Sequence, residues 1–233
     1  MQADKTYYRR LYSFRPGKSI RPEFLFTYTF PEILFEEYHG VKDLESGEPI
    51  TADSVYRQYS TTKVAVCTGA MMLLERGKFL LNDPIYEYFP EWKDTMVAQP
   101  EEDGSYRVRP AKRPILIRDC FSMAMGIGYG GTDYTHQLRA NVGEYTLQQE
   151  IKAMAEVPVA FDPGTHWLYG FGHELVAGLI EVVSGKGVGQ FLKEELFEPL
   201  DMKNTGYHYF GDIRERMVTT YLLKEDGSRE ASP

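Results

Sequence analysis

The apolar positions of the chain first form β-rich runs and later take a helical spacing. The runs 24–30 and 33–43 are rich in aromatic and branched residues and flank a short turn, which predicts a β-hairpin over 24–43. From Ser60 the run STTKVAVCTGAMMLLERGKFLL is apolar on nearly every face. This pattern is typical of a buried helix, with Ser60 as its first residue or N-cap and Gly77 just past its end.

The later part of the chain predicts further short helices. A proline-rich region over 82–113 reads as loop, and EEDGSYRVR within it favours a small hairpin. Helical spacing then recurs in 114–125, 146–157, 172–187, where Gly185 ends the helix, and in GQFLKEELFEPLDM. Strands followed by helices predict an α+β fold. We expect a single domain over 1–233 that is mainly helical over 60–205.

Composition narrows the class of protein. The 233 residues carry 34 acidic and 26 basic side chains, for a net charge of −8, which argues against nucleic-acid binding. Cys67 and Cys120 have no CxxC partner, so we interpret them as buried free thiols. The first residues lack the apolar core of a signal peptide, and no run is long enough to span a bilayer. We therefore expect a cytoplasmic protein, unless a signal has been removed. The oligomeric state is not indicated.

The most informative motif is Ser60-Thr61-Thr62-Lys63, the S-x-x-K of the chain. Residues three apart share one face of a helix, so the Lys63 amine can approach the Ser60 hydroxyl. A serine at a helix N-terminus can be activated by a neighbouring amine, and its backbone N–H can help to hold an oxyanion. The amine must be neutral to act as a base. We expect the apolar surroundings to lower the pKa of Lys63.

Four ordered blocks resemble the serine β-lactamase-like and penicillin-binding superfamily, most closely its class C β-lactamase and esterase branch. They are YRQYSTTKVAVCTGAMMLLERGKFLLNDPIYEYFPEW, PILIRDCFSMAMGIGY, FDPGTHWLYG and HELVAGLIEVVSGKGVGQFLKEELFEPLDMKNTGY. The match runs from about His39 to Tyr207. The resemblance implies a β-lactamase/transpeptidase-like fold, in which an antiparallel sheet packs with a helical region.

The resemblance also implies catalytic roles. Ser60 matches the acylated nucleophile, and its backbone N–H matches a donor of the oxyanion hole. Lys63 matches the lysine that shares the serine proton. Tyr169 matches the tyrosine of the Y-x-N motif, which assists proton transfer. Tyr129, in the Gly-rich loop 126–134 beside the active site, is a candidate pocket residue.

Two departures from the family pattern stand out. Phe171 occupies the position of the Asn in Y-x-N, which removes an amide and favours esterase chemistry over β-lactam chemistry. His173 is a candidate polar substitute, and Phe171 and His173 are further candidate pocket residues. In addition, no K-T-G or H-x-G triad follows Tyr207. We therefore expect the C-terminal sheet strands to be missing, and with them a short sheet and an exposed apolar face.

The predicted function is a serine hydrolase that acts on a small ester or amide through an acyl-enzyme on Ser60. A non-catalytic binding module with this fold and a D-alanyl peptidase are the alternatives. No metal or organic cofactor is implied, because the five histidines show no zinc-protease spacing. The G-x-G-x-x-G at 126–131 does not sit between a strand and a helix of a βαβ unit. No nucleic-acid partner is expected.

Overall fold

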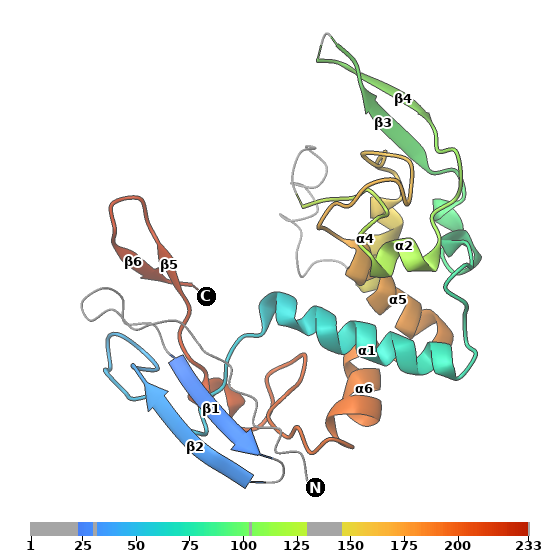
Figure 1. The fold of residues 1–233 in the computed structure, drawn as a ribbon. Coiled ribbons are helices and arrows are strands. Elements are labelled where there is room, and N and C mark those ends of the chain that lie inside the picture. Colours follow the sequence, from blue (N-terminus) through green and yellow to red (C-terminus); the bar gives the residue numbers. More distant parts are fainter. Residues whose placement is uncertain (1–22, 30–31, 103, 130–145, 233) are drawn as a thin grey trace, which may run out of the picture. The chain divides into compact units, whose positions relative to one another are not determined.

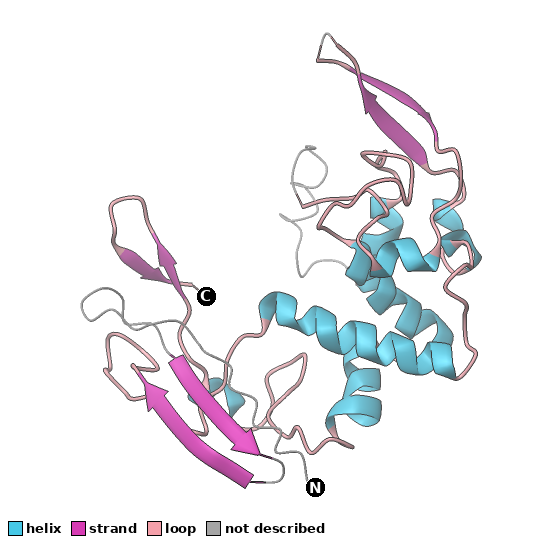
Figure 2. Cartoon of the chain, in the orientation of Figure 1, coloured by secondary structure: helices cyan, strands magenta, loops and turns pink. Residues whose placement is uncertain are grey.

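The computed structural model describes residues 23–29, 32–102, 104–129 and 146–232. The chain divides into two compact units (Figure 1). The first combines Met1–Gln58 with His208–Pro233, and the second is Tyr59–Tyr207. Among the described residues the strands form three separate two-stranded sheets. The longer helices belong to the second unit (Figure 2).

The first unit begins with a hairpin. Strand β1 (Glu23–Thr29) pairs antiparallel with β2 (Glu32–His39), in the segment where the apolar pattern predicts a hairpin. The register shifts between Thr27 and Tyr28. Such an irregularity bends a strand and increases its local twist.

The C-terminal segment folds back onto the region that follows this hairpin. It contains α7 (Ile213–Arg216), β5 (Tyr221–Leu223) and β6 (Arg229–Ala231). Thr219 N donates to Lys42 O at 2.9 Å, and the Tyr221 hydroxyl donates to Asp43 Oδ2 at 2.7 Å. Hydrogen bonds thus join the segment after β2 to the C-terminal segment within one unit.

The second unit is built around α5 (Gly172–Ser184). This helix packs against α1 (Thr62–Glu75), α2 (Ile117–Phe121), α4 (Leu147–Met154) and α6 (Val188–Leu192) (Figure 1). A π-helical turn, Lys193–Phe197, continues α6. Strands β3 (Met96–Pro100) and β4 (Tyr106–Pro110) form a hairpin that includes part of EEDGSYRVR.

Burial along α5 follows the helical periodicity that the sequence predicts for 172–187. Side chains on one side of α5 are at most 1 % exposed, and Gly185 ends the helix with a φ of 70°. This left-handed conformation costs glycine little, because it has no Cβ. Large side chains from the other elements complete the core: Ile85, Trp92, Ile115, Ile117, Ile151, Met154, Phe191 and Leu192.

The predicted α+β class is confirmed, with small antiparallel sheets beside helices. Burial around α1 differs from expectation. Val66, Ala70 and Leu73 are buried, but Val64 is 67 % exposed and Met71 41 % exposed. The buried residues recur every three to four positions and form the face that packs in the core, so the opposite face is open.

The expectation of two buried thiols is only half right. Cys120 is buried, whereas Cys67 is only partly buried, because it lies one turn beyond Lys63 on a more open face of α1. Trp92 is a core residue at 1 % exposure, whereas Trp167 is 68 % exposed. Trp167 lies in the loop before α5 and therefore belongs to the surface of the unit.

Candidate active site

Ser60 lies in a 3₁₀ turn, Tyr59–Thr61, that leads directly into α1. The N-cap of α1 is Thr61, one residue later than the sequence predicts, and no side chain caps the helix. Ser60 is exposed, and its hydroxyl makes no hydrogen bond to any residue that the structure describes. Tyr59 before it has a φ of 43°, which is uncommon for a residue with a side chain. The serine is therefore presented at the surface at the start of a helix.

Lys63 takes part in a triangle of polar contacts with Tyr129 and Glu174. Its Nζ donates to the Tyr129 hydroxyl at 2.8 Å and lies 3.6 Å from Glu174 Oε1. The Tyr129 hydroxyl in turn donates to Glu174 Oε1 at 3.2 Å. The Lys63 side chain is only 16 % exposed. Within the described part of the chain, no hydrogen bond joins Lys63 to Ser60.

The surroundings of Lys63 raise the pKa of its ammonium above the ordinary lysine value. Burial acts to lower it, as the sequence suggests, but the hydrogen bond with Tyr129 and the charge of Glu174 outweigh that effect. The expectation of a lowered lysine pKa is thus wrong for the resting site. Burial also raises the pKa of the Tyr129 phenol, although Lys63 opposes that shift.

Aromatic rings enclose the Lys63 ammonium. Its Nζ lies 5.4 Å from the centroid of the Tyr129 ring and 5.5 Å from that of the Tyr169 ring. At these distances a ring face attracts a cation. The two tyrosines meet edge-to-face at 5.5 Å, and Phe171 packs on Tyr129 in the same manner at 4.7 Å. The structure therefore brings together Lys63, Tyr169, Tyr129 and Phe171, all predicted from the sequence.

Gly170 allows this arrangement, because it lets two backbone segments meet. Gly128 and Gly170 form an isolated antiparallel bridge, and Phe171 N donates to Ile127 O at 3.2 Å. A Cβ on Gly170 would lie 2.0 Å from Ile127 O. Only glycine fits here without moving the backbone, and the close approach sets Tyr129 beside Tyr169.

Glu174 is the site residue that sequence reasoning missed. The His173 Nε2 atom lies 3.0 Å from the Phe121 carbonyl oxygen, so this side chain makes a backbone contact. The carboxylate that reaches Lys63 belongs to the next residue. Glu174 lies one helical turn after Phe171, and this i, i+3 spacing is the signal that identifies it as a neighbour of the motif.

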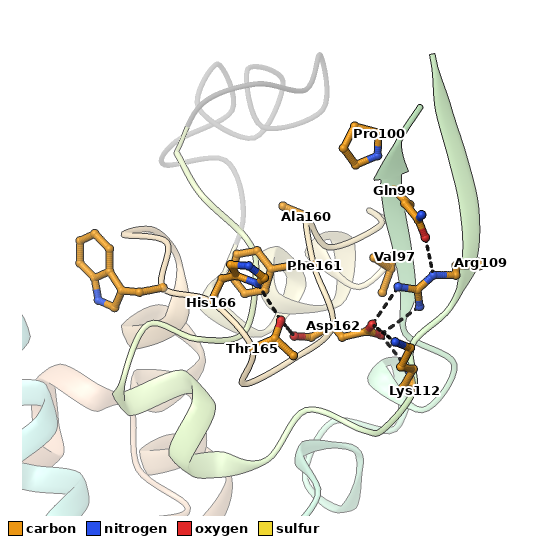
Figure 3. A pocket seen from close by; sticks show the side chains of 11 residues that line it. Val97, Gln99, Pro100, Arg109, Lys112, Ala160, Phe161, Asp162, Thr165 and His166 are labelled. Carbon is orange, nitrogen blue, oxygen red and sulfur yellow. Dashed lines mark hydrogen bonds and ion pairs between the residues drawn. The ribbon is translucent and has the colours of Figure 1, made fainter. Parts of the chain in front are cut away.

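A pocket of about 620 Å³ adjoins this cluster, because Trp167 is one of its lining residues. Figure 3 shows Phe161, Asp162 and His166 among the other residues that line it. The Trp167 ring lies 6.3 Å from the Tyr169 ring. On the other side of the pocket, Arg109 makes two hydrogen bonds of 2.9 and 2.8 Å to the Asp162 carboxylate. The remaining lining includes Val97, Gln99, Pro100, Lys112, Ala160, Phe161, Thr165 and His166.

Asp162 connects several residues in one wall of the pocket. Hydrogen bonds from Arg109 and from the Lys112 backbone N–H hold the pKa of the Asp162 carboxyl well below its usual range. The Lys112 Nζ lies 3.6 Å from the same carboxylate, and its side chain is 80 % exposed. Lys112 therefore offers a cation at the pocket rim.

Within the described ranges, no group of three or more His, Cys, Asp or Glu residues is arranged to hold a metal ion. No single helix in the same ranges is long and apolar enough to cross a membrane. The pair Gly172–Ser184 and Val188–Phe197 meets the length and composition test only when taken together across an 80° bend. The remainder of the Gly-rich loop, 130–134, lies outside the described residues.

Comparison with known proteins places these observations in a family context. The family model described as Beta-lactamase matches residues 31–233. Protein Rv1367c of Mycobacterium tuberculosis is 28 % identical over 190 residues, which are 80 % of this chain and 47 % of the relative. Esterase EstB of Burkholderia gladioli is 24 % identical over 184 residues, 76 % of this chain and 44 % of the relative.

A solved structure shares the fold. The protein described as EstCE1, a hydrolase with promiscuous acyltransferase activity, superposes with a TM-score of 0.71 at 22 % identity. The match covers 86 % of this chain and 51 % of that structure. The chain thus spans about half the length of the proteins it resembles.

Proposed function

This chain belongs to the beta-lactamase family, and on that premise we propose that it is a serine hydrolase of the esterase or acyl-transfer type. Its nucleophile is Ser60, and the reaction passes through an acyl-enzyme. The similarity to an esterase and to a hydrolase with acyltransferase activity supports this class of chemistry.

The convergence of Lys63 and Tyr169 next to the helix start that carries Ser60 is the observation on which the proposal rests. The two residues come from different segments, yet the Lys63 ammonium lies 5.5 Å from the Tyr169 ring. Ser60 is exposed and precedes Lys63 by one turn. A nucleophile, a titratable amine and a phenol are the groups that acyl transfer requires.

In the first half-reaction, the Ser60 Oγ forms a bond to the carbonyl carbon of an ester. Its proton passes to Lys63, and Tyr169 relays a proton to the departing alcohol oxygen as the ester C–O bond breaks. The backbone N–H of Ser60 is the proposed donor to the developing oxyanion. Because a protonated Lys63 cannot accept the serine proton, the fraction of neutral Lys63 limits the rate, and acylation becomes faster as pH rises.

In the second half-reaction, a water molecule or an alcohol attacks the acyl-enzyme. The Lys63–Tyr169 pair takes the proton of the acceptor and passes it to the Ser60 Oγ as the bond between that oxygen and the acyl carbon breaks. Water gives hydrolysis, and an alcohol gives a new ester. Phe171 in place of an amide favours ester substrates over β-lactams, because no amide is there to hold the substrate carbonyl.

The pocket beside Trp167 is the proposed site for one end of the substrate. Trp167 offers an exposed ring next to Tyr169, and Phe161 adds apolar surface. Lys112 at the rim would attract a polar or acidic substituent. A small ester with an aromatic or aliphatic acyl group therefore matches the pocket.

Turnover of p-nitrophenyl acetate tests the proposal. We expect the 233-residue chain to release p-nitrophenol above the buffer rate and Ser60→Ala to abolish the excess. Ser122→Ala, which removes an exposed serine hydroxyl that donates to Arg118 O, is the matched control and should remain active. Added methanol should accelerate release and yield methyl acetate if the acyl-enzyme accepts alcohols.

One observation favours a non-catalytic binding module as the second candidate. Lys63 is held by Tyr129 and Glu174 rather than by Ser60, so the resting site is not arranged for proton abstraction. Equal p-nitrophenol release by wild type and Ser60→Ala would support this alternative and refute the enzyme. A fluorescent penicillin that binds reversibly, without a covalent adduct, would give the same answer.

A further inference from the structure

Phe171 and Glu174 both contact Tyr129, the residue whose hydroxyl accepts a hydrogen bond from Lys63. The two residues stand one turn apart at the start of α5, and Glu174 N donates to Phe171 O at 3.2 Å. Phe171 packs edge-to-face on the Tyr129 ring, and Glu174 accepts the hydroxyl hydrogen bond of the same tyrosine. The ring and the hydroxyl of Tyr129 are thus fixed from one helix end.

Glu174 also supplies the negative charge nearest to Lys63. Its Oε1 lies 3.6 Å from the ammonium, and its Oε2 is buried without a hydrogen-bond partner among the described residues. A partly buried carboxylate with one unsatisfied oxygen is costly unless a cation balances it. Lys63 is the cation that does so.

We propose that Glu174 is the positioning residue that holds Lys63 against Tyr129 in the resting site and sets the pH at which Lys63 becomes available as a base. This inference rests on the proposed function, in which Lys63 must be neutral to accept the Ser60 proton. Glu174 acts through Lys63 and Tyr129 and does not itself touch the reacting atoms.

Other titratable groups face Glu174 and bear on this pH dependence. Burial and the charge of Glu174 raise the pKa of Glu150 on α4. The same two causes raise the pKa of Tyr207 to about 12. Tyr129 and Tyr169 face Lys63 from the other side. Of these groups, Glu174 is the carboxylate that raises the pKa of Lys63.

The sign of the effect follows from the charge. A carboxylate favours the protonated amine, so replacing Glu174 with glutamine lowers the pKa of Lys63. The rising limb of the pH–rate profile then moves to lower pH. Each pH unit of movement is a tenfold gain in the fraction of neutral Lys63 below the limb. The substitution also weakens the contact that positions Lys63. This second effect lowers the plateau of the pH–rate profile, by roughly tenfold for one charge-assisted hydrogen bond.

The experiment compares the 233-residue wild type with Glu174→Gln and with Glu181→Gln. Glu181 lies on the same helix and bonds to Gln148 and to Val188 N, away from Lys63. The Lys63 ammonium is titrated by ¹³C NMR at Cε, with the resonance assigned through Lys63→Arg. The rate of p-nitrophenyl acetate acylation is recorded over the same pH range. Circular dichroism confirms that each variant is folded.

We expect Glu174→Gln, and not Glu181→Gln, to move both the Lys63 titration and the acylation limb to lower pH. An unchanged Lys63 titration in folded Glu174→Gln overturns the inference, whether or not the chain is an esterase. Absence of any Ser60-dependent acylation in wild type overturns the proposed function instead, while the NMR titration still tests the contact between Glu174 and Lys63. A lower plateau with an unmoved limb assigns Glu174 a structural role only and also overturns the inference.

Discussion

Lys63 donates a 2.8 Å hydrogen bond to the hydroxyl of Tyr129, although 66 positions separate them in the chain. Lys63 belongs to the first turn of α1, whereas Tyr129 follows a Gly-rich segment that runs beside Gly170. The contact therefore depends on three separate parts of the chain. It shows that the candidate site is assembled by tertiary structure and not by the S-x-x-K motif alone.

Tyr129→Phe tests this contact. The variant keeps the ring packing against Phe171 but removes the hydroxyl that raises the pKa of Lys63. We expect the limb of the pH–rate profile to move to lower pH and the plateau to fall about tenfold, measured with p-nitrophenyl acetate. Tyr88→Phe removes a 2.8 Å hydrogen bond to Asp83 elsewhere in the same unit and should leave the profile in place. A shift of equal size in both variants would contradict the assignment.

Gly170→Ala tests the close backbone approach. The added Cβ would lie 2.0 Å from Ile127 O, which cannot move away as a flexible side chain can. We expect a loss of about 2–3 kcal/mol in the free energy of unfolding, measured by urea denaturation. Gly187→Ala is the control, because its Cβ meets no atom closer than 3.9 Å. Equal stability of the two variants would show that the backbone at Gly170 has room to relax.

Asp162→Asn tests the ion pair between Asp162 and Arg109 in the pocket wall, through the pH dependence of stability. The folded pKa of Asp162 lies below its unfolded value, so its contribution to stability is complete above the unfolded pKa of about 3.9 and is lost as pH falls further. The difference in unfolding free energy between wild type and Asp162→Asn should be largest near neutral pH and shrink under acid. The exposed Asp94→Asn is the control and should change the unfolding free energy only slightly near neutral pH. A pH-independent difference for Asp162→Asn would contradict the ion pair with Arg109.

Trp167→Ala tests the pocket as a substrate site. Because Trp167 is 68 % exposed and lies beside Tyr169, its loss should remove substrate contact without unfolding the unit. We expect KM for an aromatic ester to rise about tenfold, equivalent to about 1.4 kcal/mol, with little change in kcat. Tyr106→Ala, at the same 68 % exposure on β4 but outside the pocket lining, should leave KM unchanged. A fall in kcat alone would place Trp167 outside substrate binding.

Much of the second unit could be predicted from local pattern. The spacing of apolar residues in 172–187 fixes which side of α5 is buried, and Gly185 marks its end. The residues Lys63, Tyr129, Tyr169 and Phe171 were predicted as site residues, and they meet in the structure. Helix periodicity carries the first prediction and the resemblance to a family carries the second, and both depend on short stretches of sequence.

The charge state of Lys63 could not be predicted in the same way. Apolar neighbours on α1 suggest a lowered pKa, but a carboxylate over a hundred positions away reverses the shift. Likewise, Trp167 is a large aromatic residue of a type that is often buried. It is nevertheless exposed, because the loop that carries it runs along the surface. Both outcomes depend on long-range packing, which single-chain periodicity does not encode.

Intact-mass and peptide mass spectrometry after brief acid quench of p-nitrophenyl acetate reactions is the most direct test of the acyl-enzyme on Ser60. We expect an added acetyl mass on the peptide that contains Ser60 in wild type, and none at that position in Ser60→Ala. Ser122→Ala should be labelled like wild type. An unlabelled Ser60 peptide, in a folded chain that releases p-nitrophenol no faster than Ser60→Ala, would contradict this expectation.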